Sequence, residues 1–266
     1  MQNGVPIEEI FQNPSMEYGP APFWFLNNDL QEEDVDWFLR ELSEKHNSGV
    51  FLHPRTGLEI DYLTEEFWKK IAYCIETCRK YGLKAWLYDE YNWPSGVAGG
   101  KLLREHPEFI QRYLDYKRER VEKGKTVRIP VEGELVAAVA VNEKENKVIP
   151  LDDRISGSQL EVQRELEGWS VAVFTVKTNQ DIFFSTTCAP WAGNETGYLD
   201  LLNRNAVRCF IEYTHEEYRK RFKDDFGDLI PGVFTDEPAN YRGLPWTDGF
   251  LEEFRKRKGY LSLIHI

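Results

Sequence analysis

The chain has 266 residues, of which 41% are hydrophobic and 29% charged, a composition typical of a globular protein rather than a disordered one. Its 45 acidic and 33 basic residues give a formal net charge of −12, which repels polyanions and excludes nucleic acid and anionic membranes as favourable partners. No apolar run reaches the length of about 18 residues that a membrane helix needs. Residues 1–10 lack the basic start and apolar stretch of a signal peptide, so a cytoplasmic location is expected.

A strand, a polar tip and a helix recur three times in the first part of the chain. Apolar runs at 22–26, 50–52 and 83–88 predict buried strands, and polar residues follow each of them directly. Apolar residues at helical spacing predict one helix from Glu33 to Ser48 and a second after Thr64, a suitable N-cap residue. Repeated units of this kind predict a parallel sheet with functional residues at one edge.

The pattern then changes to short strands separated by turns. Strands are predicted at 127–131, 135–141, 147–151, 159–163 and 169–176, which indicates a small all-β insertion. A long helix follows, with an apolar stripe that starts at Leu199 and an end at Gly227. After it we predict a fourth strand at 230–235 and a helix from about Thr247 to Lys258.

These elements predict an α/β fold, namely a partial (β/α)₈ TIM barrel with the first four strands and an all-β insertion between strands 3 and 4. The expected divisions are barrel residues 1–110 and 195–260, and the insertion at 120–185. Residues 261–266 (LSLIHI) match the translation of a sequencing-library adapter and are expected to be an artefact. We expect the four strands to lie parallel and adjacent in chain order, and half a barrel to be inactive alone.

The four cysteines follow no redox or zinc-binding spacing. Cys74 and Cys78 stand four residues apart in a helical pattern, which predicts one shared buried face, and Cys188 and Cys209 stand alone. With no CxxC pair and only five histidines, a structural zinc site is not expected. Free thiols fit a reducing compartment.

The candidate functional residues lie at the strand ends, where barrel enzymes carry their active sites. Any single acid there is as readily a helix cap or a solvated rim residue. Acids at three strand tips, mixed with His, Arg, Asn and Trp, favour a site instead. The substrate-binding candidates are Asn27, Asn28, His53, Arg55, Asp89, Asn92 and Trp93, and the catalytic candidates are Glu237, Asp236 and Glu90.

Cleavage of a glycosidic bond needs two carboxyl groups, one to protonate the leaving oxygen and one to activate water or attack carbon. Asp236 and Glu237 directly follow an apolar strand, and Pro238 fixes the turn after them. Adjacent strand residues point to opposite sides, so one of the two acids should face the barrel axis. We predict Glu237 as the general acid, because its longer side chain reaches past the rim, and Asp236 as its support.

The run from Tyr88 to Gly96 offers a second cluster, in which aromatic rings can stack on a sugar and an amide can bind hydroxyl groups. Trp93 is also part of a rigid Trp-Pro-Ser-Gly turn, and we expect this segment both to form the turn and to contribute to the substrate-binding cluster. His53 and Arg55 are predicted to bind substrate by donating hydrogen bonds, because no Ser or Cys stands in an elbow motif for them to activate.

Four segments, APFWFLNNDL (21–30), GVFLHPRTGL (49–58), LKAWLYDEYNWPSGVAGG (83–100) and GVFTDEP (232–238), resemble the α-L-rhamnosidase-like enzymes of glycoside hydrolase family 106. The resemblance implies a (β/α)₈ catalytic barrel, inversion at the anomeric carbon, a calcium cofactor, and glycoside or oligosaccharide substrates that carry terminal rhamnose or a related sugar in plant or microbial glycans. It matches Asp236 and Glu237 to a carboxylate-bearing strand tip of the family and implies a further acidic partner beyond Tyr260.

Two other functions stay open on the sequence. A non-catalytic carbohydrate-binding barrel would keep the aromatic residues, but the retained Glu237 stands against it. A metal-dependent hydrolase or lyase could use His53 with Asp89, Glu90 and Asp236, but the chain has no HxH or HxxE spacing of the kind typical of such sites.

Overall fold

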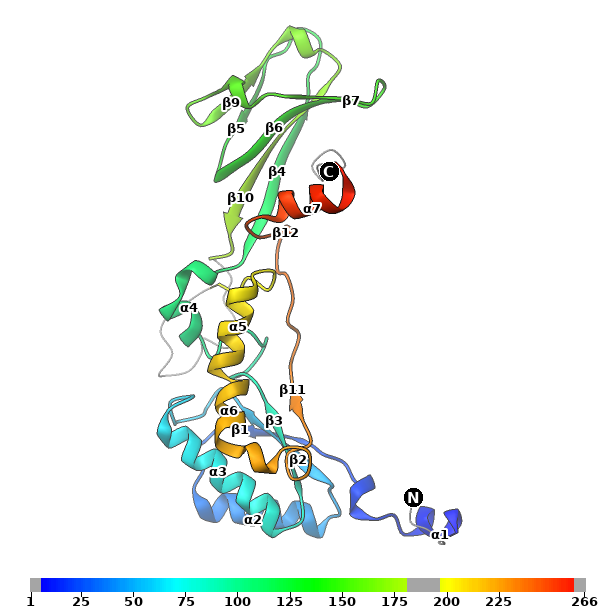
Figure 1. Cartoon of the computed structure of the whole chain (residues 1–266), viewed down its shortest axis with the longest axis vertical. Coiled ribbons are helices and arrows are strands. Elements are labelled where there is room, and N and C mark those ends of the chain that lie inside the picture. The colour runs from blue at the N-terminus through cyan, green and yellow to red at the C-terminus, as the bar shows by residue number, and fades with distance from the viewer. Residues whose placement is uncertain (1–5, 181–196, 261–266) are drawn as a thin grey trace. The chain divides into compact units, whose positions relative to one another are not determined.

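The computed structural model describes residues 6–180 and 197–260, which form two compact units (Figure 1). The first, called here the α/β unit, comprises residues 6–108, 197–199 and 204–239. The second, called the β unit, comprises residues 109–180, 200–203 and 240–260. Cys188 and the segment 261–266 lie outside the described residues.

The α/β unit is built on a four-stranded sheet in the order β1-β2-β3-β11, and every neighbouring pair is parallel. Its strands are β1 (Phe23–Leu26), β2 (Gly49–Pro54), β3 (Lys84–Tyr88) and β11 (Val233–Phe234). The predicted order and direction of these four strands are confirmed. Within the described residues the sheet is open, since β1 and β11 each have one unpaired edge.

Helices α2 (Glu32–Glu44), α3 (Glu65–Lys80) and α6 (His215–Phe222) pack against one face of this sheet. The other helices of the unit are α1 (Ile7–Gln12), which buries no residue, α4 (Lys101–Glu105) and α5 (Arg204–Tyr213). The core joins Leu52 and Leu87 of the strands to α2, α3 and α6, and it includes the predicted inner face of α3 with the free thiols Cys74 and Cys78. Thr64 caps α3 as predicted, because its hydroxyl accepts a hydrogen bond from the Phe67 N–H. Of the described helices, none is long and apolar enough to span a membrane.

The opposite face of the sheet carries aromatic side chains, because alternate residues of each strand point there. In the outer strand β1, Phe23 and Phe25 are 43% and 42% exposed, and Phe234 of β11 is 36% exposed. The aromatic residues of this face contact one another, with ring centroids of Phe23 and Phe234 5.1 Å apart. We call this surface the aromatic face; its members are Phe23, Phe25, Phe51, His53, Trp86, Tyr88 and Phe234.

The β unit contains a five-stranded antiparallel sheet, in the order β12-β4-β10-β6-β7, and a three-stranded sheet, in the order β5-β9-β8 (Figure 1). The elements are β4 (Arg112–Arg120), β5 (Val127–Pro130), β6 (Glu134–Asn142), β7 (Lys147–Pro150), β8 (Ile155–Ser156), β9 (Gln159–Val162), β10 (Ser170–Thr178), β12 (Leu244–Trp246) and α7 (Phe250–Lys258). Apolar residues of several of these strands, among them Ile129, Ala138 and Val173, form the unit's core.

Two predicted elements differ from those in the structure. The helix predicted from Leu199 to Gly227 is two helices, α5 and α6, with Leu199 and Leu202 before the first and a break at Thr214, whose hydroxyl bonds back to the Phe210 carbonyl oxygen at 2.9 Å. The strand predicted at 230–235 is reduced to Val233–Phe234, because Pro231 has no N–H to donate to a ladder.

Candidate active site

The loop after β3 is organised around the carboxylate of Glu90. This side chain is fully buried and accepts hydrogen bonds from five backbone N–H groups, those of Tyr91, Gly96, Val97, Ala98 and Gly99. Burial raises the pKa of Glu90 to about 7, while these hydrogen bonds act in the opposite direction. Neither carboxylate oxygen of Glu90 is exposed, so neither can contact a substrate. In this geometry Glu90 stabilises the loop, in contrast to its predicted catalytic role.

One glycine of this loop is required by its surroundings. Gly96 has φ of 142°, and a Cβ built there would lie 2.8 Å from the hydroxyl oxygen of Tyr198. That hydroxyl donates a hydrogen bond to the Ser95 carbonyl oxygen. A side chain at position 96 would therefore displace Tyr198 and disturb the backbone that surrounds Glu90.

Asp89 joins the ends of β3 and β11. The hydroxyl groups of Ser95 and Thr235 donate hydrogen bonds to its two carboxylate oxygens at 2.6 and 2.7 Å, and Nε2 of His215 lies 3.4 Å from the second oxygen. The residue is fully buried, and burial raises its pKa. Both carboxylate oxygens of Asp89 accept hydrogen bonds inside the protein, so this geometry does not support the predicted contact of Asp89 with substrate.

Asp236 lies at the end of β11 and turns towards the aromatic face. The Tyr88 hydroxyl donates a 2.6 Å hydrogen bond to its Oδ2, and its backbone N–H donates to the Ser95 hydroxyl at 2.9 Å. Burial raises the pKa of Tyr88 well above its usual value, so this hydroxyl stays protonated and acts as the donor. Asp236 is therefore held in one orientation while remaining partly accessible.

His53 stacks on Tyr88, with ring centroids 3.6 Å apart and an interplanar angle of 18°. It is 2% exposed, its Nε2 lies 3.4 Å from the Asn92 carbonyl oxygen, and its Nδ1 is a buried atom with no hydrogen-bond partner among the described residues. Burial lowers the pKa of His53 to about 4, so the ring is neutral near pH 7. The structure thus brings together His53, Tyr88 and Asp236 at the strand ends.

Arg55 extends this group along the rim. Its guanidinium carbon lies 4.2 Å from the ring centroid of Phe25 and 4.3 Å from that of Trp93, which is partly exposed. Asn92 is buried, and its amide exchanges hydrogen bonds with Thr56. Arg55 and Trp93 are therefore the predicted binding residues that present surface here, whereas the amide of Asn92 is used inside the fold.

Glu237 follows Asp236 and is exposed, and its backbone φ of 49° lies in the left-handed region that non-glycine residues seldom adopt. Strain at such a position is frequent at functional sites.

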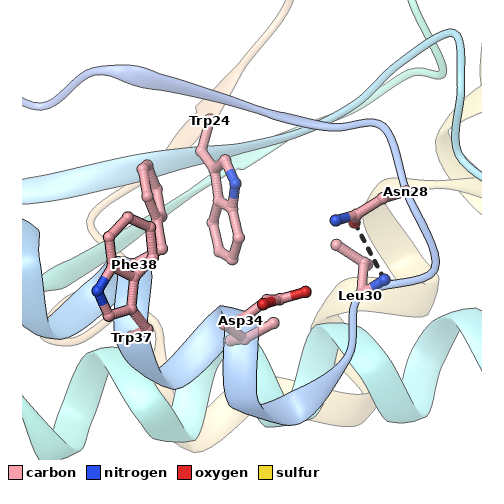
Figure 2. Close-up of a pocket in the computed structure, with 7 residues that line it drawn as sticks. Trp24, Asn28, Leu30, Asp34, Trp37 and Phe38 are labelled. Atoms are coloured by element: carbon pink, nitrogen blue, oxygen red, sulfur yellow. Dashed lines mark hydrogen bonds between the residues drawn. The ribbon is translucent and has the colours of Figure 1, made fainter.

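Asn27 is exposed, and Asn28 lines a separate pocket on the helix-covered side of β1, beside Trp24 and Asp34 (Figure 2). The structure therefore separates Asn28 from the group around Asp236.

Four residues of this site were not predicted from the sequence, namely Tyr88, Ser95, Thr235 and His215. Tyr88 and Ser95 stand in the run from Tyr88 to Gly96 that was predicted as a second cluster, and Thr235 directly precedes Asp236. His215 is the first residue of α6 and is distant from Asp89 in the sequence, so no local sequence pattern predicts their contact. Among the described residues, no group of three or more His, Cys, Asp or Glu is placed to hold a metal ion.

No family model matches the chain, and no curated protein matches it in sequence. Among solved structures it is similar to the rhamnosidase from Novosphingobium sp. PP1Y, with a TM-score of 0.55 and 12% sequence identity. The match covers 98% of this chain and 42% of that one, so this chain spans less than half the length of the rhamnosidase. At this identity the similarity shows a shared fold, a mixed α/β architecture in which parallel and antiparallel sheets occur together.

Proposed function

We propose that this chain forms part of the catalytic (β/α)₈ barrel of a glycoside hydrolase that cleaves a terminal rhamnose-like sugar. The observation that carries the proposal is the carboxylate of Asp236, oriented by Tyr88 at the carboxyl end of a parallel sheet. Active sites of α/β barrels lie at that end of their strands. The sugar class is supported by the similar structure, which is that of a rhamnosidase.

The barrel interpretation is supported by the two faces of the sheet. Helices pack against one face, as they do around the outside of a barrel, and the uncovered aromatic face corresponds to its interior. Four strands in chain order make half of the eight that a closed barrel needs. The remaining strands would lie in another part of the whole protein.

In the proposed reaction, Glu237 donates its proton to the glycosidic oxygen as the bond from that oxygen to the anomeric carbon breaks. A water molecule adds to the anomeric carbon and gives its proton to a second carboxylate, so that a free sugar and an alcohol leave. Asp236, fixed by Tyr88, orients the sugar next to Glu237, while Trp93 and Arg55 form the exposed rim beside it. Asp89 and Glu90 are enclosed, so we assign the second carboxylate to another part of the whole protein.

For the calcium that the family resemblance implies, we assign no ligands in the described residues, where no three acidic, His or Cys side chains cluster. No step of the proposed reaction is routed through it. The metal-dependent hydrolase considered above is also disfavoured. The four side chains that it would use make separate hydrogen bonds and form no common ligand group; they are His53, Asp89, Glu90 and Asp236.

The test is Glu237→Gln in the whole protein, assayed on an alkyl and a nitrophenyl α-L-rhamnoside. Loss of the acid should lower kcat/KM on the alkyl glycoside by roughly 10²- to 10⁴-fold, and much less on the nitrophenyl glycoside, whose leaving group departs without protonation. Asp236→Asn should lower both rates, and Glu59→Gln, an exposed acid elsewhere in the α/β unit, should change neither. Equal losses on both substrates for Glu237→Gln would assign it another role, and glycoside binding without hydrolysis would favour the non-catalytic alternative.

A further inference from the structure

A pocket of about 240 Å³ lies between β1 and the start of α2, within the α/β unit (Figure 2). Its lining consists of Trp24, Asn28, Leu30, Asp34, Val35, Trp37 and Phe38. Trp24 points to the helix-covered side of β1, where its ring centroid is 4.8 Å from that of Phe38. Its neighbours Phe23 and Phe25 point to the aromatic face, so this pocket is separate from the candidate active site.

The pocket combines aromatic walls with free polar groups. Trp37 is 55% exposed. The carboxylate of Asp34 makes no hydrogen bond or ion pair among the described residues, although it lines the pocket. Asn28 uses its Oδ1 to accept the Leu30 N–H at 3.0 Å, which fixes the amide and leaves its N–H₂ group as a donor towards the pocket (Figure 2).

From this arrangement we infer a second carbohydrate-binding site, which takes one neutral pyranose ring. The apolar face of a sugar stacks on an aromatic ring, while its hydroxyl groups need an acceptor and a donor at the edge, here Asp34 and Asn28. The volume lies below the range of about 300–1,000 Å³ usual for drug-sized ligands, which fits a single ring. This inference does not rest on the proposed hydrolase activity.

The charges around the pocket select a neutral ligand. Asp34 follows Glu32 and Glu33 in the first turn of α2, and this acidic turn repels uronic acids and sulfated sugars. A small organic cation would satisfy the aromatic rings and Asp34, but it would leave the Asn28 amide donor without a partner. A neutral sugar uses all three kinds of group.

The experiment is ¹⁹F NMR of the whole protein labelled with 5-fluorotryptophan, in which single Trp→Phe variants assign the resonances of this chain's tryptophans. Methyl α-L-rhamnoside and methyl β-D-glucoside are titrated to about 20 mM, because a single ring is expected to bind with a Kd on the order of 1 mM. The resonances of Trp24 and Trp37 should shift and saturate with at least one of these glycosides, while that of Trp169 in the β unit should not move. Asp34→Asn should weaken the binding about three- to tenfold, and Glu33→Gln, the matched exposed acid beside it, should leave the Kd unchanged.

Three results would overturn the inference. The first is no shift of either resonance with both glycosides, which would assign the pocket to packing by another segment of the protein. The second is an unchanged Kd in Asp34→Asn. The third is a larger and tighter response to choline chloride than to either sugar. Asp236→Asn should leave this binding intact, so failure here and failure of the proposed hydrolase activity are distinguishable.

Discussion

At the residue scale, burial and hydrogen bonding have opposite effects on the pKa of Glu90, which burial raises and the backbone hydrogen bonds lower. Its pKa of about 7 in the fold lies above its ordinary value of 4.5, so the folded state holds the proton more tightly and the free energy of unfolding falls as pH rises from 4.5 to 7. The limiting slope is about 1.4 kcal/mol per pH unit. Glu90→Gln cannot titrate and therefore lacks this slope.

We expect Glu90→Gln to lower the free energy of unfolding by about 1–3 kcal/mol at pH 5, because its amide N–H₂ faces backbone donors. The loss should shrink towards pH 8, where the wild type has lost its protonated carboxyl group. Urea unfolding at several pH values measures this, with the exposed Glu59→Gln as control. A loss that grows with pH would show that the five N–H groups outweigh burial and keep Glu90 ionised.

His53 should give the opposite slope. Its pKa in the fold, about 4, lies below the ordinary 6.5, so the unfolded state binds the proton first and stability falls as pH drops from 6.5 to 4. His53→Phe keeps a ring stacked on Tyr88 and should gain stability relative to the wild type as pH falls through this window. Thermal unfolding from pH 7 to 4 measures the difference, with the exposed His46→Gln as control. A pH-independent difference would mean that His53 does not resist protonation.

The sequence predicted which strand ends carry polar residues, but not how each side chain is used. Asp236 and Arg55 do lie at the rim with the aromatic face, as expected from strands that end together. The side chains of Glu90 and Asn92 instead accept hydrogen bonds from backbone N–H groups of the buried loops, which have no other acceptor in a strand or helix. This need for acceptors depends on the loop's path, which residue types alone do not specify. The roles assigned to Glu237 and Asp236 stay predictions.

At the element scale, local signals predicted α3 well. Thr64 accepts a hydrogen bond from the Phe67 N–H, and one apolar stripe is buried in the core. Thr64→Ala should lower the free energy of unfolding of the chain by about 1 kcal/mol, since one N–H of the first turn loses its partner. Urea unfolding followed by circular dichroism tests this. Thr64→Ser keeps the hydroxyl and should lose much less; equal losses in both variants would point to the threonine methyl group rather than the cap.

Elements specified by distant partners were harder to predict. Most of the nine residues of β4 are charged and none of them forms an apolar run, so the strand is defined by its pairing with β10 along its whole length. The break at Thr214 likewise depends on one hydroxyl that bonds the Phe210 carbonyl oxygen inside a continuous apolar stripe. Periodicity reports which face is buried, but it does not report such a break.

At the scale of the whole molecule, the four parallel strands in chain order follow from the strand, tip and helix repeats, since right-handed crossovers leave few other arrangements. The sequence did not reveal that the uncovered face of this sheet is aromatic, because short apolar runs do not show which residues point to which side. Exposure of Phe23, Phe25 and Phe234 follows from the open sheet.

The aromatic face leads to a prediction about association. Exposed contiguous apolar surface and unpaired strand edges favour contacts between copies, so we expect the chain of 266 residues to self-associate at micromolar concentration and to bind the dye ANS. Phe25→Ser with Phe234→Ser removes apolar surface from this face and should shift the sedimentation profile towards monomer and lower ANS fluorescence. Phe11→Ser is the matched control, because Phe11 is 86% exposed on α1, away from the sheet, and should change neither reading. A chain that sediments as a cooperatively melting monomer without ANS binding would show that this face is stable in water, and would remove the main support for reading it as the interior of a barrel.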